Sequence, residues 1–195
     1  MAHMPSPFVD PPWNIALDVA MCLASIPQHA EIAGMYCNAL VAAGKRKGVT
    51  FSTARERYVQ FNYYPVSEFA RMLVEATDRL YPALSKREAL RKLGQGGPKA
   101  FAGSLLGKVV LGSAEGVHAT VLAVAKTYEV NTRPSRCWVK ETRPQSMIVS
   151  LENVYHFLDS HHVGVFEGTL RFAGVNGRVR IASHGRTAAD LLLEW

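Results

Sequence analysis

The sequence lacks several features that would point at once to a compartment. It has three cysteines in 195 residues, Cys22, Cys37 and Cys137, which are widely spaced and odd in number, so no disulfide framework is indicated. No apolar run approaches the roughly 18–20 residues that a membrane-spanning helix needs. The N-terminus also lacks the basic-then-apolar order of a signal peptide. These absences predict a reducing, cytoplasmic location and no membrane span.

Motifs for catalysis are missing as well. There is no Gly-x-Ser-x-Gly turn that would expose a nucleophilic serine, and no Cys-x-x-Cys pair. The stretch Gly103–Lys108 resembles a phosphate-binding loop, but it is one residue short between its glycines. Val109 also stands where the magnesium-binding hydroxyl should be. We therefore expect a protein without enzymatic activity.

Histidines are the residues that most invite a functional interpretation. His156, His161 and His162 are close in the sequence and lie in a segment with helical periodicity. An α-helix turns 100° per residue, so His156 and His161 would lie about 140° apart and could not share a metal ion. His118 could ligate haem, but a lone histidine without a second signal is more often structural. The sequence predicts no metal and no cofactor, with haem or another apolar ligand as the alternative.

The formal net charge is +6. A basic chain is compatible with nucleic acid, acidic lipid or an acidic protein partner. No basic run has interleaved aromatic residues, and no DNA-binding motif is present. Solvated helix ends and strand faces are the simpler interpretation, and nucleic-acid binding stays open as an alternative.

Hydrophobic periodicity changes from helical to alternating along the chain. The expected helices are 14–25, 31–47, 67–81, 85–94, 99–111, 113–126 and 155–173. The expected strands are 128–132, 136–142, 145–154, 178–183 and 189–195. This order predicts an α+β domain, in which N-terminal helices pack on a C-terminal antiparallel sheet built as hairpin, helix, hairpin.

Local signals set several of these boundaries. Ser85 and Glu88 have the spacing of a capping box, which predicts a helix start. The run Gly94–Pro98 is expected to break that helix. The Pro-rich residues 1–13 are expected to form an extended tail, in which residues 1–3 are interpreted as a cloning remnant, and residues 14–195 a single domain.

An apolar face on the first long helix is the best candidate for a pocket wall. Met35, Tyr36 and Leu40 recur there at helical spacing, with Cys37 beside them. We add Phe166 from the last helix and His118 as candidate pocket residues. Whether Cys37 is modified stays open.

Five segments together resemble a known family. They are IALDVAMCLASIPQHAEIAGMYCNALV, YYPVSEFARMLVEATDRLYP, SKREALRKLG, FAGSLLGKVVLG and HHVGVFEGTLRFAGV…LLLEW. In this order they resemble an uncharacterised family present as many paralogues in myxobacteria. The positions that match its C-terminal pattern as framework are Gly164, Glu167, Gly168, Leu170, Gly174 and Trp195. Gly164 and Gly168 would let a neighbouring element approach closely.

At one remove, the C-terminal half resembles vinyl-reductase-like sensor domains, which share a fold with haem-NO-binding domains and TRAPP vesicle-tethering subunits. This resemblance implies a cavity between the N-terminal helices and the C-terminal sheet, which in relatives holds haem, an aromatic ligand or an acyl chain. The haem-propionate motif Tyr-x-Ser-x-Arg is absent, and so are the C-terminal cysteines of the vinyl-reductase group. Neither haem nor any catalytic residue therefore carries over.

We expect a non-enzymatic, cytoplasmic regulatory or sensory module that binds a small apolar ligand or a protein partner, and that forms a homodimer. One alternative is a TRAPP-like interaction subunit that acts on a small GTPase. The other is a basic nucleic-acid-binding protein. The ligand, the partner and the role of the basic surface are left open by the sequence.

Overall fold

The structure is a computed structural model that describes residues 6–195, apart from the side chain of Leu105. The helices are α1 (Val19–Ala24), α2 (Gly34–Arg46), α3 (Val66–Leu80), α4 (Lys86–Ala102), α5 (Leu105–Gly112), α6 (Gly116–Asn131), the π-helix η1 (Leu158–His162) and α7 (Val163–Phe172). The strands are β1 (Glu31–Ala33), β2 (Tyr63–Pro65), β3 (Thr132–Arg133), β4 (Arg136–Arg143), β5 (Ser146–Glu152), β6 (Arg178–Ser183) and β7 (Ala189–Glu194). The suggested cloning residues 1–3 lie outside the described residues.

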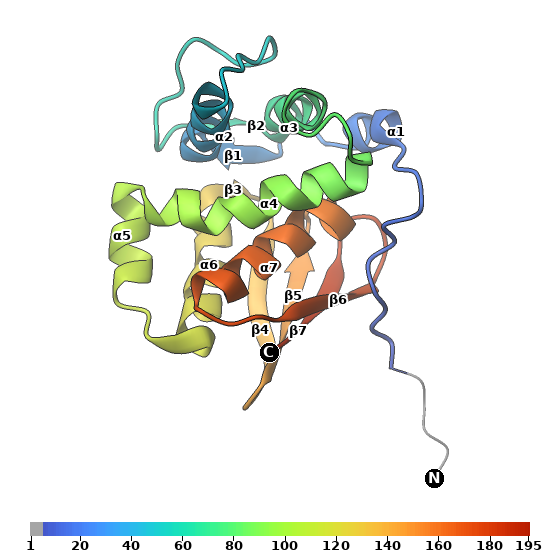
Figure 1. Cartoon of the computed structure of the whole chain (residues 1–195), viewed down its shortest axis with the longest axis vertical. Helices are drawn as coiled ribbons and strands as arrows, with labels where there is room; N and C mark the ends of the chain where they lie inside the picture. The colour runs from blue at the N-terminus through green and yellow to red at the C-terminus, as the bar shows by residue number, and fades with distance from the viewer. Residues whose placement is uncertain (1–5) are drawn as a thin grey trace.

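The chain folds into layers that follow its sequence order (Figure 1). A four-stranded antiparallel sheet has the order β4-β5-β7-β6, and α6 and α7 contact it. Helix α4 lies across α7, and α2 and α3 contact the far side of α4. The strands of the small sheet β2-β1-β3 contact α2, α3 and α6. This arrangement confirms the α+β class and the helix-first order predicted from the sequence.

The sheet register follows the alternating apolar pattern. Met147 and Val149 of β5 pair with Leu193 and Leu191 of β7, and all four side chains are buried. Because side chains alternate between the two faces of a strand, this register places one apolar row against the helices. Both hairpins lie where the period-two pattern predicted them.

Helix α4 contradicts one prediction, because it runs straight through Gly94–Pro98 instead of breaking there. The glycine at 94 has a packing reason. A methyl group there would lie 2.1 Å from the carbonyl oxygen of His161. A helix that buries one side against a neighbour gains enough from that contact to offset weak intrinsic propensity.

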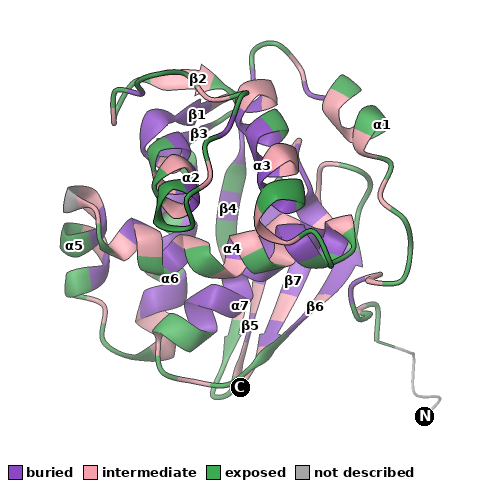
Figure 2. Ribbon diagram, turned by 45° about the horizontal axis from the view of Figure 1, so that its top comes forward, coloured by how far each residue is buried: buried purple, intermediate pink, exposed green. Residues whose placement is uncertain are grey.

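On the α7 side of the same contact, two glycines face the backbone of α4. A methyl group at Gly164 would lie 2.2 Å from the carbonyl oxygen of Arg91, and one at Gly168 would lie 2.4 Å from that of Gln95. The two backbones therefore approach closely, and α7 is buried along most of its length (Figure 2). The buried Glu167 accepts hydrogen bonds from Arg91 and Gln95 across the contact.

The segment predicted as one helix, 155–173, is not one α-helix. Phe157 has a left-handed backbone conformation with φ of 48°, the π-helix η1 follows it, and the α-helix begins only at Val163. Its end agrees with the prediction, since Gly174 has φ of 83°. Hydrogen bonds from Gly174 N to Arg171 O and from Val175 N to Leu170 O close a Schellman motif there.

Other helix and strand boundaries shift where pairing decides them. Glu31–Ala33, predicted as helix, pairs with β2 and β3 and becomes strand β1. The predicted strand 128–132 is instead the last turn of α6, and only Thr132 pairs in β3. The capping box at Ser85 and Glu88 is present as predicted.

The segment before α1 is tied to the sheet edge. Val9 and Ile181 of β6 exchange backbone hydrogen bonds of 3.0 and 2.8 Å. In residues 6–195, no helix combines the length and the apolar character needed to cross a membrane.

We expect Gly164→Ala and Gly168→Ala each to lower the free energy of unfolding by about 1–3 kcal/mol, because the added methyl group meets backbone that cannot move without separating α4 from α7. Urea denaturation followed by circular dichroism measures this. Gly96→Ala, in α4 with open space around the position, is the matched control. It should stabilise the protein by up to about 1 kcal/mol through helix propensity. Equal effects at all three positions would contradict the packing argument.

Candidate functional site

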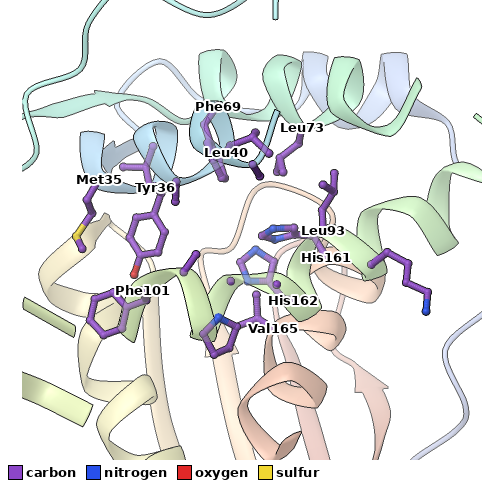
Figure 3. Close-up of a pocket in the computed structure, with 18 of the residues that line it drawn as sticks. Met35, Tyr36, Leu40, Phe69, Leu73, Leu93, Phe101, His161, His162 and Val165 are labelled. Carbon is purple, nitrogen blue, oxygen red and sulfur yellow. The ribbon is translucent and has the colours of Figure 1, made fainter. Parts of the chain in front are cut away.

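A cavity of about 440 Å³ lies between the helices (Figure 3). Its walls come from both of the hydrophobic clusters into which the buried core divides. The apolar lining side chains include Ile32, Met35, Leu40, Phe69, Leu73, Leu93, Phe101, Val124 and Val165. The size and the apolar lining are those of a small-molecule pocket.

Small residues account for the space. Helix α4 presents Gly96, Gly97 and Pro98 to the cavity, and α2 presents Ala39 and Ala43. Larger side chains at these positions would fill a gap of this kind, as they do in ordinary close-packed cores. The glycine-proline run that suggested a helix break is therefore part of a pocket wall.

Three histidines converge on the cavity. His156, His161 and His162 all line it, and one ring nitrogen from each lies within 4.8 Å of the others. His156 and His162 are buried, and Figure 3 shows the rings of His161 and His162 pointing into the cavity. Three imidazoles at this spacing form a set of nitrogen donors that could hold a metal ion.

The sequence-based argument against a histidine cluster was wrong, because it assumed an α-helix from residue 155. The left-handed turn at Phe157 separates His156 from the helix. The backbone amides of Ser160, His161 and His162 all point at the carbonyl oxygen of Phe157, and the wider π geometry changes the angle between successive side chains. Three histidines within seven residues were the available signal, but their convergence depends on this local backbone.

The hydrogen bonding of the cluster is incomplete. His162 Nδ1 shares a hydrogen bond of 2.8 Å with the hydroxyl of Tyr128 on α6. The other nitrogen of His162, Nε2, and Nδ1 of His161 are buried and have no partner within the described chain. Buried polar atoms are usually satisfied, so two such atoms in one cluster indicate a place for a ligand.

The imidazoles are neutral at physiological pH. Burial lowers the pKa of His156 to about 4. Burial, together with the charge of His156, lowers the pKa of His161 to about 3, and the pKa of His162 is shifted well below its usual value for the same reasons. Neutral imidazoles keep a lone pair available for a ligand.

The structure places the sequence-predicted pocket residues in two groups. Met35, Tyr36 and Leu40 of α2 line the cavity. Phe166 instead stacks on Tyr128 inside the core against the sheet, with ring centroids 6.1 Å apart. The resemblance implied a cavity between the N-terminal helices and the C-terminal sheet, but the cavity lies between helices and no residue of β4, β5, β6 or β7 lines it.

His118 and Cys37 also lie outside the cavity lining. The His118 ring nitrogen Nε2 is 2.8 Å from the carbonyl oxygen of Arg143, and its ring packs against Trp195. Cys37 is fully buried in the hydrophobic cluster built on α2 and α3. Burial, with Glu68 nearby, raises the pKa of its thiol to about 12, so it is no nucleophile at neutral pH.

Fold and site together define an α+β protein with a histidine-containing cavity between helices. The chain belongs to the family described as Protein of unknown function (DUF2378), whose model matches residues 26–195. A comparison with the curated proteins finds no match.

Several solved structures share the fold. A mutant H-NOX protein from S. oneidensis in the Fe(II) ligation state has a TM-score of 0.65 at 14% identity, over 84% of this chain and 95% of that one. An oxygen-binding H-NOX domain related to soluble guanylate cyclases has a TM-score of 0.60 at 12% identity, over 83% and 91%. A third, described as probing heme distortion in the H-NOX family, has a TM-score of 0.62 at 12% identity, over 84% and 95%.

The donor set of this chain does not fit a haem site. A porphyrin iron has one coordination position on each face, so it could use only one of three imidazoles that converge from one side. The other imidazoles would stay buried with unpartnered nitrogens, which is costly. The shared fold therefore does not bring the cofactor with it.

We expect the stability of the metal-free protein to fall as the pH drops below about 6.5, the pKa of an exposed imidazole. The histidines of the cluster have lower pKa values when folded. The unfolded chain therefore binds protons first, at a cost of up to about 1.4 kcal/mol per pH unit for each histidine. Urea denaturation with a chelator, from pH 7.5 to pH 5, measures the slope.

His156→Gln should reduce this slope by the amount that corresponds to about one proton, because one histidine fewer takes up a proton on unfolding. His29→Gln changes an exposed histidine outside the cavity and serves as the control for removing a histidine elsewhere in the chain. A profile that is flat between pH 7.5 and pH 5 would show that the imidazoles are not held neutral.

Proposed function

We propose that this chain is a non-enzymatic sensory module, cytoplasmic as its cysteine content suggests, that binds a small apolar molecule in the cavity between α2, α3, α4 and α6. The observation that supports this most directly is the cavity itself, about 440 Å³ in a core that is otherwise well buried. An empty apolar space of this size costs stability, because the lining atoms lose dispersion contacts. A bound apolar molecule would restore those contacts.

The mouth of the cavity suggests one polar feature of the ligand. Arg46, Lys47 and Lys92 line the pocket and are exposed. No ion pair of the described chain includes any of the three. We therefore propose a molecule with an apolar body, buried among the helices, and an acidic group at the basic mouth.

The position of the cavity suggests how ligand binding could change the conformation of the protein. Its walls belong to two separate hydrophobic clusters, one built on α2 and α3 and the other on the sheet with α6 and α7. A molecule held between them contacts both and so favours one relative position of the two clusters. The resemblance in fold to H-NOX proteins fits such a sensory role.

The alternatives have less support. Several basic residues outside the mouth form ion pairs within the chain: Arg87 pairs with Asp159, Arg91 with Glu167, and Arg178 and Arg180 with Glu194. Such pairing leaves fewer free cations for phosphates. A homodimer, a protein partner and a TRAPP-like role with a small GTPase stay predictions from the resemblance.

A fluorescent long-chain carboxylic acid and its methyl ester are the probes for this proposal. We expect the acid to bind saturably at one molecule per chain. Ala39→Phe should weaken its binding at least about tenfold, because the ring would occupy the cavity. Fluorescence titration measures the affinity, and native mass spectrometry measures the stoichiometry.

Matched variants test separately whether the ligand occupies the cavity and whether its acidic group lies at the basic mouth. Ala42→Phe, on the exposed side of the same helix and outside the lining, should leave affinity unchanged. Lys92→Gln should weaken binding of the acid a few-fold, as expected for the loss of an exposed charge pair. It should leave binding of the ester unchanged. If Ala39→Phe and Ala42→Phe have the same effect, the ligand does not occupy this cavity.

A further inference from the structure

We infer that His156, His161 and His162 form a binding site for a divalent transition metal ion, with zinc as the best match. Each of the three lines the cavity, and one nitrogen from each lies within 4.8 Å of the others. They come from the segment that joins β5 to α7, which is held against α4 at Gly94. The site is therefore attached to the most tightly packed contact of the fold.

The spacing suits an ion after a small closure. Three nitrogens bound to one tetrahedral zinc, at about 2.0–2.1 Å from it, lie about 3.3 Å apart. The nitrogens here are up to 4.8 Å apart, so rotation of the imidazoles about their side-chain bonds would bring them to bonding distance. The backbone that carries them need not unfold.

Unpartnered nitrogens are the second, independent observation. Nε2 of His162 is buried and has no hydrogen-bond partner in the described chain, and its residue is only 4% exposed. Nδ1 of His161 is likewise buried and has no hydrogen-bond partner in the described chain. A metal ion between them would satisfy both atoms at once.

Tyr128 has the role expected of a group that orients a metal ligand. Histidines that bind metal generally use their second ring nitrogen in a hydrogen bond that fixes the tautomer. The Tyr128 hydroxyl is 2.8 Å from His162 Nδ1. When Nδ1–H donates to the hydroxyl oxygen, the lone pair of Nε2 points away from Tyr128 and is free to bind.

The donor type selects the metal. Imidazole nitrogens favour zinc, copper, iron and nickel, whereas magnesium and calcium prefer oxygen ligands. The group of possible ligands identified in the described residues contains no carboxylate. It contains three nitrogens, which is the protein ligand set of a zinc site with one open position.

Unusual backbone marks the same segment. Phe157 is buried and has φ of 48°, a backbone conformation that is strained for a bulky residue, and η1 is a π-helix. Both features are frequent at functional sites. In this segment, one nitrogen from each of the three imidazoles lies within 4.8 Å of the others.

The site deepens the function proposed above, because its open position faces the same cavity. Water, or a donor atom of the bound molecule, would complete the tetrahedron there. Metal binding itself does not depend on the organic ligand, since the donors belong to the chain. A test with the ion alone therefore separates the two proposals.

The experiment uses the full chain, stripped of metal with a chelator and dialysed. We expect Co²⁺ to bind at one ion per chain and to give the intense visible absorption of four-coordinate cobalt, and Zn²⁺ to displace it. X-ray absorption at the zinc edge should show imidazole scattering. Thermal unfolding should shift to higher temperature with added Zn²⁺, because the ion binds only the folded state.

Variants test the residues. His161→Gln should weaken metal affinity by more than about 100-fold, and Tyr128→Phe by about 10–100-fold. His29→Gln should have no effect. Circular dichroism of each metal-free variant establishes that it is folded, and the X-ray absorption spectrum of the wild-type chain tests the ligands even if a variant does not fold.

Three results would overturn the inference. The first is the absence of stoichiometric Co²⁺ and Zn²⁺ binding to the wild-type chain. The second is binding that His161→Gln and His29→Gln weaken equally. The third is a haem titration that reaches one haem per chain and excludes Co²⁺, which would assign the imidazoles to a porphyrin iron.

Discussion

The close contact between α4 and the segment from η1 through α7 is the constraint on which the rest of the structure depends. Gly94 on one side, and Gly164 and Gly168 on the other, remove the Cβ atoms that would keep the two backbones apart. The contact buries α7 between α4 and the sheet, and it allows Glu167 to bond Arg91 and Gln95. It also fixes the turn that carries the histidines, so the same packing supports both the fold and the candidate site.

The cavity follows from how the helices are layered. The helices α2 and α3 form one hydrophobic cluster, the sheet with α6 and α7 forms another, and small residues of α4 and α2 leave space between them. H-NOX structures share this fold at low identity, so the likeness concerns architecture. In this chain, three converging imidazoles suit an ion better than a porphyrin. A shared fold does not by itself determine which ligand a protein binds.

Predictions from sequence succeeded where the cause is local. The capping box at Ser85, the helix stop at Gly174 and the two C-terminal hairpins depend on a few neighbouring residues or on a strict period of two. They failed where a distant contact competes with local propensity. Helix α4 continues through Gly94–Pro98 because it packs on α7, and Glu31–Ala33 is strand because β2 and β3 supply its hydrogen bonds.

The sequence by itself determined the α+β order of elements, the apolar face of α2 and the presence of three histidines within seven residues. Only the tertiary structure decided that those histidines meet. A left-handed residue at Phe157 and one π turn reorient the side chains, and the glycine contact with α4 holds that backbone in place. Neither a positive φ at a phenylalanine nor a π turn has a sequence signature, because both are imposed by packing against residues about seventy positions away in the chain.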